Sequence, residues 1–204
     1  METIQKETDY PSADLFIECP SQSDRLSAFF RIFYALPILI LFSLVIGFSS
    51  DEGMMIGGGI LFLPVMLTIL FRNRYPKVWF EWNLYLSGFM MRVVSYLFLL
   101  RDEYPSIDDQ QFVKLDLRYP DVEKELSRGL PLIKWFLAIP HYLVLAFLFI
   151  AVITITIIAW FSILFTGKYP PRMHEFVVGV FRWGLRVNAY AFLLLTDKYP
   201  PFRL

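Results

Sequence analysis

The sequence lacks several features that would indicate a catalytic or nucleic-acid-binding protein. Its 204 residues contain one cysteine, Cys19, which excludes an intramolecular disulfide and a metal site built from several cysteines. Nineteen Lys and Arg balance nineteen Asp and Glu, so the net charge does not predict a nucleic-acid partner. No Ser-His-Asp or Cys-His arrangement is recognisable. We therefore expect no enzymatic activity, no catalytic residues, no metal and no cofactor.

Two further motifs are incomplete. The run Gly57-Gly58-Gly59 lacks the Lys and the Ser or Thr of a phosphate-binding loop. His174-Glu175 supplies two possible metal or acid-base groups, but no HExxH spacing or third ligand accompanies them. The first 24 residues carry six acidic side chains and no apolar core, so we expect no cleavable signal peptide.

Long apolar runs dominate the chain. Apolar residues make up 56 % of the sequence, and phenylalanine alone occurs 21 times. From Leu130 to Phe165 only Lys134 and His141 interrupt the run with titratable side chains. A membrane-crossing helix needs about 20 residues, so this segment is too long for one crossing. The sequence predicts a transmembrane helical hairpin over residues 130–165 with its turn near Ala151–Thr156.

The rest of the chain follows a similar plan. We expect a first hairpin over 26–71, bent at Pro37, and amphipathic helices lying in the membrane interface over 77–100 and 172–195. Alternating apolar residues predict short strands over 13–19 and 113–119, which could pair with one another. The fold class is thus an all-α integral membrane protein with four crossings. The alternative has six crossings, with both amphipathic helices spanning the bilayer.

Similar segments recur in the two halves of the sequence. Residues 31–37 (RIFYALP) resemble 134–140 (KWFLAIP) at a spacing of 103, and Tyr75-Pro76 resembles Tyr169-Pro170 at a spacing of 94. We therefore predict a disordered tail over 1–12 and two pseudo-repeats over 13–105 and 106–204. With four crossings, all basic residues fall on one side of the membrane, which places both termini in the cytoplasm.

The second half also resembles a known family. The resemblance rests on Lys134-Trp135, Ala138-Ile139-Pro140-His141, Thr166-Gly167-Lys168-Tyr169-Pro170, Arg182-Trp183 and Leu195-Thr196-Asp197-Lys198-Tyr199-Pro200. These motifs are similar to those of the bacterial membrane-protein family catalogued as domain of unknown function 4389, over residues 112–202. The first half is more degenerate, with Phe80 where the second half has His174. The resemblance implies a bacterial integral membrane protein, and it implies no activity and no catalytic residues.

A few charged residues within the apolar segments are candidate binding residues. Arg92, Arg182 and Arg186 could bind the phosphate of lipid headgroups, with Glu81 and Glu175 as partners on the same helix stripes. The alternative is that these arginines only anchor helices at the interface.

His141 follows the helix-bending Pro140 within the long apolar run. It could form an intramembrane polar site, or it could bond a backbone carbonyl that Pro140 frees.

These features favour a non-enzymatic membrane protein. We expect an accessory, partner-binding or lipid-interacting subunit of a complex in the bacterial inner membrane, with membrane lipids and other membrane-protein subunits as its partners. The alternative is a small transporter or channel with a path between the two halves. An enzyme acting on lipid ranks third.

Overall fold

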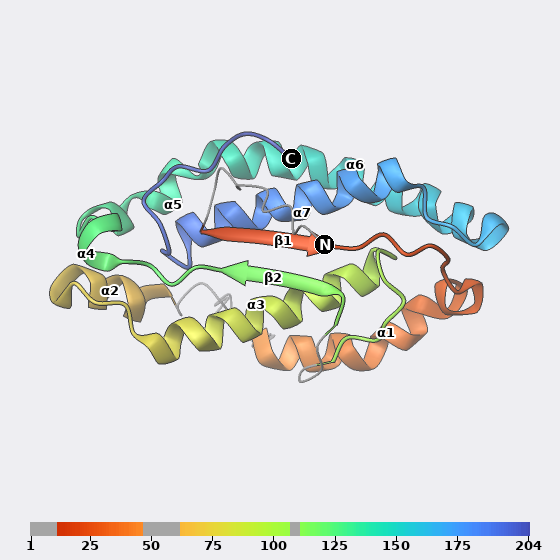
Figure 1. Ribbon diagram of the computed structural model, residues 1–204, viewed down its shortest axis with the longest axis horizontal. Coiled ribbons are helices and arrows are strands. Elements are labelled where there is room, and N and C mark those ends of the chain that lie inside the picture. Colours follow the sequence, from red (N-terminus) through yellow and green to blue (C-terminus); the bar gives the residue numbers. More distant parts are fainter. Residues whose placement is uncertain (1–11, 47–61, 107–110) are drawn as a thin grey trace, which may run out of the picture.

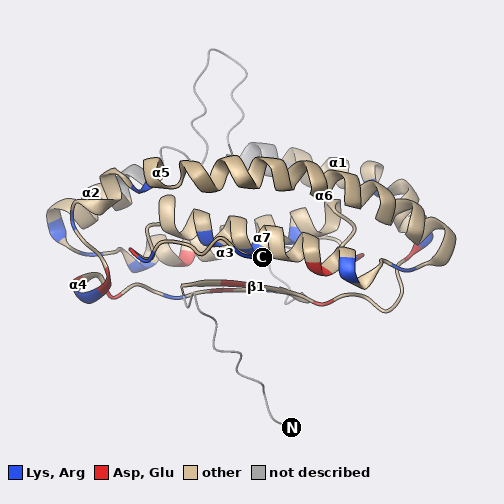
Figure 2. Cartoon of the chain, turned by 90° about the horizontal axis from the view of Figure 1, so that it is seen from above, with Lys and Arg blue, Asp and Glu red and all other residues tan. Residues whose placement is uncertain are grey.

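The computed structural model describes residues 12–46, 62–106 and 111–204, and these form three layers. A two-stranded sheet forms one outer layer, two amphipathic helices form the middle layer, and the most apolar helices form the other outer layer (Figures 1 and 2). The helices and the strands run roughly along the same long axis. Each apolar helix therefore lies over the middle layer along much of its length.

The sheet consists of β1 (Ala13–Ile17) and β2 (Val113–Leu117), which pair antiparallel. Leu15 lies opposite Leu115 at the centre of the register. Alternate side chains of β1 are buried, as expected for a strand with one covered face. The pairing that the alternating sequence pattern predicted is therefore present, and each strand ends two residues earlier than predicted.

The middle layer contains α3 (Lys77–Leu97) and α7 (Pro171–Ala191). Helix α7 packs on β1 and on α6, and α3 packs on β2 and on α1. Because both of its sides are covered, α7 buries more than half of its residues. The two predicted amphipathic segments are helical, but α7 is not the surface helix that its charged stripe suggested.

The apolar outer layer is built mainly from two long helices and several short ones. Its elements are α1 (Arg25–Ile46), α2 (Phe62–Arg72), the 3-10 helix η1 (Leu130–Leu132), α5 (Lys134–Leu137) and α6 (Ile139–Thr166). The short helix α4 (Val122–Glu125) connects the sheet to this layer. Gly167 ends α6 in the left-handed conformation (φ 73°), which glycine adopts readily after the last turn of a helix.

The predicted fold class is wrong in two respects. The described structure includes a sheet, so it is not all-α, and α6 is the one described helix that is long and apolar enough to cross a membrane. Four crossings, and equally six, are not supported. The predicted hairpin over 130–165 is also wrong, because α6 runs without a turn through Ala151–Thr156. The physical reason is the absence of any helix-breaking residue in that stretch, where β-branched and aliphatic side chains continue the helix.

Some predictions fall outside the described residues. The disordered tail predicted over 1–12 lies outside the described residues except for Ser12. The turn of the hairpin predicted over 26–71 also lies outside them, because residues 47–61 are not described. Helix α1 continues through Pro37, the residue predicted to bend it.

Candidate functional site

The outer layer presents a broad apolar surface to the outside of the protein. Only 11 % of the most apolar stretch of α6 is buried, whereas the core helix of a water-soluble protein is mostly buried. Side chains that are at least half exposed cover both long helices and α5: Phe29, Ile32, Phe33, Leu36 and Ile40 on α1, Trp135 and Phe136 on α5, and Leu143, Phe147, Ile150, Ile157 and Phe165 on α6. A continuous apolar surface of this kind marks contact with a membrane or another protein.

Charged residues are almost absent from this surface. Lys, Arg, Asp and Glu gather in the two other layers and at the ends of the molecule (Figure 2). Helix α6 contains none of these four residue types. Two cations of the layer, Arg25 and Arg72, are exposed at the first residue of α1 and the last residue of α2. The other two, Arg31 and Lys134, are 3 % and 0 % exposed and point inward. The layer therefore keeps charge away from the middle of its outer surface.

The inward-pointing Arg31 enters a cluster at the end of α3. Its NH1 group donates to the carbonyl oxygen of Arg101 at 2.9 Å, and its NH2 group forms an ion pair with Asp102. The guanidinium also lies 4.2 Å from the ring centre of Tyr96, which is a cation–π distance. The second oxygen of Asp102 accepts the backbone N–H of Asp24 at 3.0 Å. This cluster ties the start of α1 to the segment after α3.

Lys134 makes a matching set of contacts at the end of α7. Its Nζ donates to the carbonyl oxygen of Thr196 at 2.7 Å and lies 2.7 Å from Oδ1 of Asp197. It lies 5.3 Å from the ring centre of Tyr190, and the second oxygen of Asp197 accepts the backbone N–H of Ser127. Burial lowers the pKa of the Lys134 ammonium, and the hydrogen bond and charge of Asp197 oppose that decrease.

The comparisons with known proteins concern the part of the chain that contains this second cluster. Residues 131–203 match the family model described as Domain of unknown function (DUF4389). We call residues 131–203 the DUF4389 domain, after the family model that they match. No curated protein and no solved structure is detectably similar to the chain. The match agrees with the family resemblance of the sequence motifs, and it adds no activity, because the family description names none.

Within the DUF4389 domain, His141 lies in an aromatic cluster. It is fully buried, and Nε1 of Trp183 donates to its Nδ1 at 3.1 Å. Its ring stacks on Phe202 with 4.0 Å between ring centres, and the ring of Tyr199 is 4.8 Å away. Because Nδ1 accepts a hydrogen bond, the proton of the neutral imidazole is on Nε2. The cluster attaches the C-terminal segment to α6 and α7.

The arginines predicted to bind headgroups are engaged inside the protein. In the DUF4389 domain, Nε of Arg182 donates to the carbonyl oxygen of Leu15 at 2.9 Å and lies 3.2 Å from Oδ1 of Asp14. Arg186 is buried, with 5 % exposure. In the first half of the chain, NH1 of Arg92 donates to the carbonyl oxygen of Ser106 at 2.7 Å. Their headgroup role stays a prediction.

The acidic residues predicted as their partners lie at the surface. Glu81 and Glu175 are both exposed, and neither takes part in an ion pair within the described residues. His174, next to Glu175, is buried at 3 % exposure. No group of three possible metal ligands occurs among the described residues.

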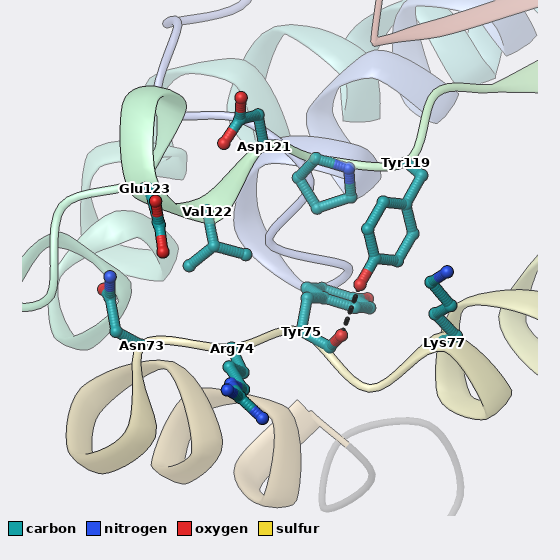
Figure 3. Close-up of a pocket in the computed structure, with 9 residues that line it drawn as sticks. Asn73, Arg74, Tyr75, Lys77, Tyr119, Asp121, Val122 and Glu123 are labelled. Atoms are coloured by element: carbon teal, nitrogen blue, oxygen red, sulfur yellow. Dashed lines mark hydrogen bonds between the residues drawn. The ribbon is translucent and has the colours of Figure 1, made fainter.

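A cleft at one end of the molecule contains charges of both signs (Figure 3). Its volume is about 580 Å³, and its walls are the α2–α3 connection and the segment from β2 to α4. Arg74 and Lys77 lie on the first wall, and Asp121 and Glu123 on the second. The hydroxyl of Tyr119 donates to the carbonyl oxygen of Tyr75 at 2.5 Å and joins the two walls.

Sequence reasoning found some residues of these clusters and missed others. It matched Arg31 with Lys134. It did not identify Asp102 and Asp197 as their partners. The available signal was the pattern Leu-Leu-x-Asp-x-Tyr-Pro, which begins at Leu99 and recurs 95 residues later.

Proposed function

We propose that this protein is a non-enzymatic, lipid-interacting protein that lies in the plane of a membrane surface, with its apolar outer layer inserted among the lipids. The observation that carries the proposal is the exposed apolar surface of α1, α5 and α6, whose two internal cations turn inward to aspartates. Transfer of apolar side chains from water is favourable, at about 1.5–3 kcal/mol for each large side chain that is fully buried. The lipid bilayer is the partner whose chemistry fits such a surface.

The layer order supports an in-plane orientation rather than a crossing by α6. The strands run along α6 with the middle layer between them, so a perpendicular α6 would bring the sheet into the hydrocarbon (Figure 1). The exposed Lys114 and Asp116 of β2 and the free edges of a two-stranded sheet would then face lipid. Both are costly in hydrocarbon. In the in-plane orientation the apolar layer faces the lipid, and the sheet faces water.

The sequence predicts Arg92 and Arg182 at the level of the lipid headgroups, but in this orientation they lie in the middle layer, away from the lipid-facing surface. Arg182 lies on the side of α7 that faces the sheet, because it contacts Leu15 and Asp14. We therefore favour exposed basic residues at the ends of the apolar layer, such as Arg25 at the start of α1 and Arg72 at the end of α2, for contacts with headgroups. The bacterial inner membrane and the cytoplasmic side stay predictions.

We further infer that the two halves are copies of one structural plan. Arg31 and Lys134 make the same types of contact, with an aspartate, a backbone carbonyl and a tyrosine ring. Leu99 and Leu194, which are 95 residues apart, share a positive φ of 61° and 55°. These correspondences support the predicted repeat, although the second half has the long α6 where a hairpin was predicted.

The transporter alternative receives no comparable support. His141, the residue proposed to line a path, is enclosed by the rings of Trp183, Tyr199 and Phe202. The accessory-subunit alternative uses the same apolar surface, with a protein as its occupant. The vesicle experiment below distinguishes lipid from protein as the partner of this surface, because lipid is the only partner present in it.

The proposal is tested by flotation of the purified chain with phospholipid vesicles. Ile150, which is 63 % exposed at the middle of α6, is changed to Lys. We expect the bound fraction to fall at least about tenfold, because a charge replaces an inserted aliphatic side chain. The matched control is Phe16→Lys, on the sheet and 55 % exposed, which should bind as before. Equal binding by all three proteins would refute docking by the apolar layer.

Spin labels along α6 test the orientation. Single cysteines replace Leu143, Ile150 and Ile157, all more than half exposed, in a chain with Cys19 changed to Ser. An in-plane helix should place all three labels at one shallow depth in the bilayer, as measured by accessibility to oxygen and to a polar relaxation agent. A crossing helix would place the middle label deepest, and that result would overturn the in-plane orientation.

A further inference from the structure

The cleft beside α2 presents both signs of charge across one cavity. Lys77 stands at one side and Glu123 at the other, with Arg74 on the wall that carries Lys77 (Figure 3). All three side chains are exposed, and none is in an ion pair with another described residue. Asp121 pairs with Lys124 at 3.4 Å, but this contact is exposed and therefore weak. The cleft can thus offer cations and a carboxylate to the same ligand.

We propose that this cleft binds a ligand with a phosphate and a primary ammonium group, the pair found in phosphoethanolamine headgroups. Lys77 and Arg74 would bind the phosphate oxygens, and Glu123 would accept hydrogen bonds from the ammonium. A purely anionic ligand would be repelled by Glu123 and Asp121, and a simple cation by Lys77 and Arg74. A cleft of about 580 Å³ is within the range of small-molecule sites and larger than one headgroup requires.

The position of the cleft agrees with a lipid source for this ligand. It lies where α2, an element of the apolar layer, meets the connection to α3. Phe71 and Val78, which lie within two residues of the lining residues Asn73 and Lys77 in the sequence, are 77 % and 80 % exposed, so exposed apolar side chains flank this wall in the chain. This step rests on the proposed function, because it needs the apolar layer to face lipid. Free phosphoethanolamine esters share the chemistry and are the second possible source.

The tyrosine contacts hold the two walls at a fixed separation. Tyr119 donates to the Tyr75 carbonyl, and the hydroxyl of Tyr75 donates to the carbonyl oxygen of Leu193 at 2.8 Å within the protein. The rings of Tyr75 and Tyr119 meet edge to face with 6.1 Å between ring centres. A preorganised cleft binds with a smaller entropic cost than one that must order on binding.

A second cleft at Tyr169-Pro170 supplies a matched control. Lys168 lines it together with serine and threonine residues, and no Asp or Glu is among its described lining residues. It can offer a cation to a phosphate but no carboxylate to an ammonium. Substitution of Lys168 should therefore leave selectivity for ethanolamine unchanged.

The test measures binding of soluble headgroups to the full chain by saturation-transfer nuclear magnetic resonance. We expect glycerophosphoethanolamine to bind more tightly than glycerophosphocholine, which has no N–H donor, and than glycerophosphoglycerol. Glu123→Gln and Lys77→Gln should each weaken that binding about tenfold, the effect of losing one charge-assisted hydrogen bond. Lys168→Gln should not. Equal binding of the three headgroups, or unchanged binding by Glu123→Gln, would overturn the proposal.

Binding to vesicles distinguishes a lipid headgroup from a free ester as the ligand. It also distinguishes a failure of the cleft proposal from a failure of the proposed function. If lipid is the source, adding phosphatidylethanolamine to phosphatidylcholine vesicles should increase flotation of the unchanged chain but not of Glu123→Gln. If only the soluble ester shows the Glu123 dependence, a free ester is the ligand. Flotation with phosphatidylcholine alone reports the apolar layer, so loss of that binding marks a failure of the proposed function and not of the cleft.

Discussion

The ammonium of Lys134 and the carboxylate of Asp197 lie 2.7 Å apart, and the lysine has no exposure to solvent. They are far apart in sequence, at the beginning of α5 and just beyond α7. The pair joins the apolar layer to the middle layer at a point where the charge of Lys134 would otherwise face lipid or the protein interior. This relationship explains how a lysine is tolerated within an apolar segment, and it leads to the first prediction.

Asp197→Asn should lower the free energy of unfolding by about 3–5 kcal/mol, because it leaves a buried ammonium without its counter-charge. Adding Lys134→Met should recover most of that loss, since both charges are then absent. Chemical denaturation followed by circular dichroism measures the effect. Glu175→Gln, at an exposed residue of the same domain, is the control and should change stability by less than about 0.5 kcal/mol. If Asp197→Asn behaves like this control, the ion pair has no role in stability.

His174 should make stability decrease in acid. Burial lowers the pKa of His174 below 6.5, the nearby charge of Arg101 lowers it further, and a hydrogen bond to the Leu100 backbone opposes the shift. The unfolded chain therefore binds a proton at a higher pH than the folded chain does. As the pH falls from about 6.5 through the lower folded-state value, the free energy of unfolding should decrease.

The control for this prediction is His174→Phe, which places in the second half the residue that the first half has at Phe80. Phenylalanine is a suitable replacement because Phe80 packs edge-on to Tyr75 in the first half much as His174 packs edge-on to Tyr169. Below pH 6.5 the free energy of unfolding should decrease less steeply with falling pH in this variant than in the unchanged chain. Thermal unfolding at several pH values measures the difference. An identical slope in both proteins would assign the acid sensitivity to other groups.

Two glycines should respond to alanine with opposite signs. Gly167 has φ +73°, and an added Cβ would lie 3.4 Å from Nε of Arg25, so Gly167→Ala should destabilise the protein by about 1–2 kcal/mol. Gly184 lies within α7, and an added Cβ would meet nothing within 4 Å. Gly184→Ala should therefore stabilise by about 0.5–1 kcal/mol. Thermal unfolding of the two variants checks the signs, and a stabilising Gly167→Ala would contradict the left-handed cap.

The sequence predicted the local elements well. Alternating apolar residues located both strands, and the 3.6-residue periodicity located α3 and α7. These signals are local, because strand alternation and helix periodicity depend on residues only a few positions apart.

The error about the outer layer came from reading apolar length as membrane crossings. The run over 130–165 was divided into two crossing helices because its length exceeds the bilayer thickness. That argument assumes an orientation perpendicular to the membrane. In the structure the run forms η1, α5 and one long helix, α6, that lies along α7. The length of the run therefore does not indicate how many times the chain crosses a membrane.

The candidate site residues likewise combine a local pattern that the sequence shows with contacts that it does not. Arg92, Arg182 and Arg186 were selected because they share a helix stripe, and periodicity cannot say what that stripe faces. Arg182 faces β1, a strand more than 160 residues away in the sequence. The partners Asp102 and Asp197 lie in short polar segments after the helices, where periodicity gives no signal.

The sequence by itself determined which segments are strands and helices, which residues are too apolar for an ordinary soluble surface, and which motifs recur. Only the tertiary structure decided that α7 is covered on both sides, that Arg31 and Lys134 turn inward to aspartates, and that the apolar side chains gather on one outer layer. The physical reason is that helix and strand formation follow from neighbouring residues, whereas the direction in which a charge or an apolar face points depends on packing between segments that are distant in the chain.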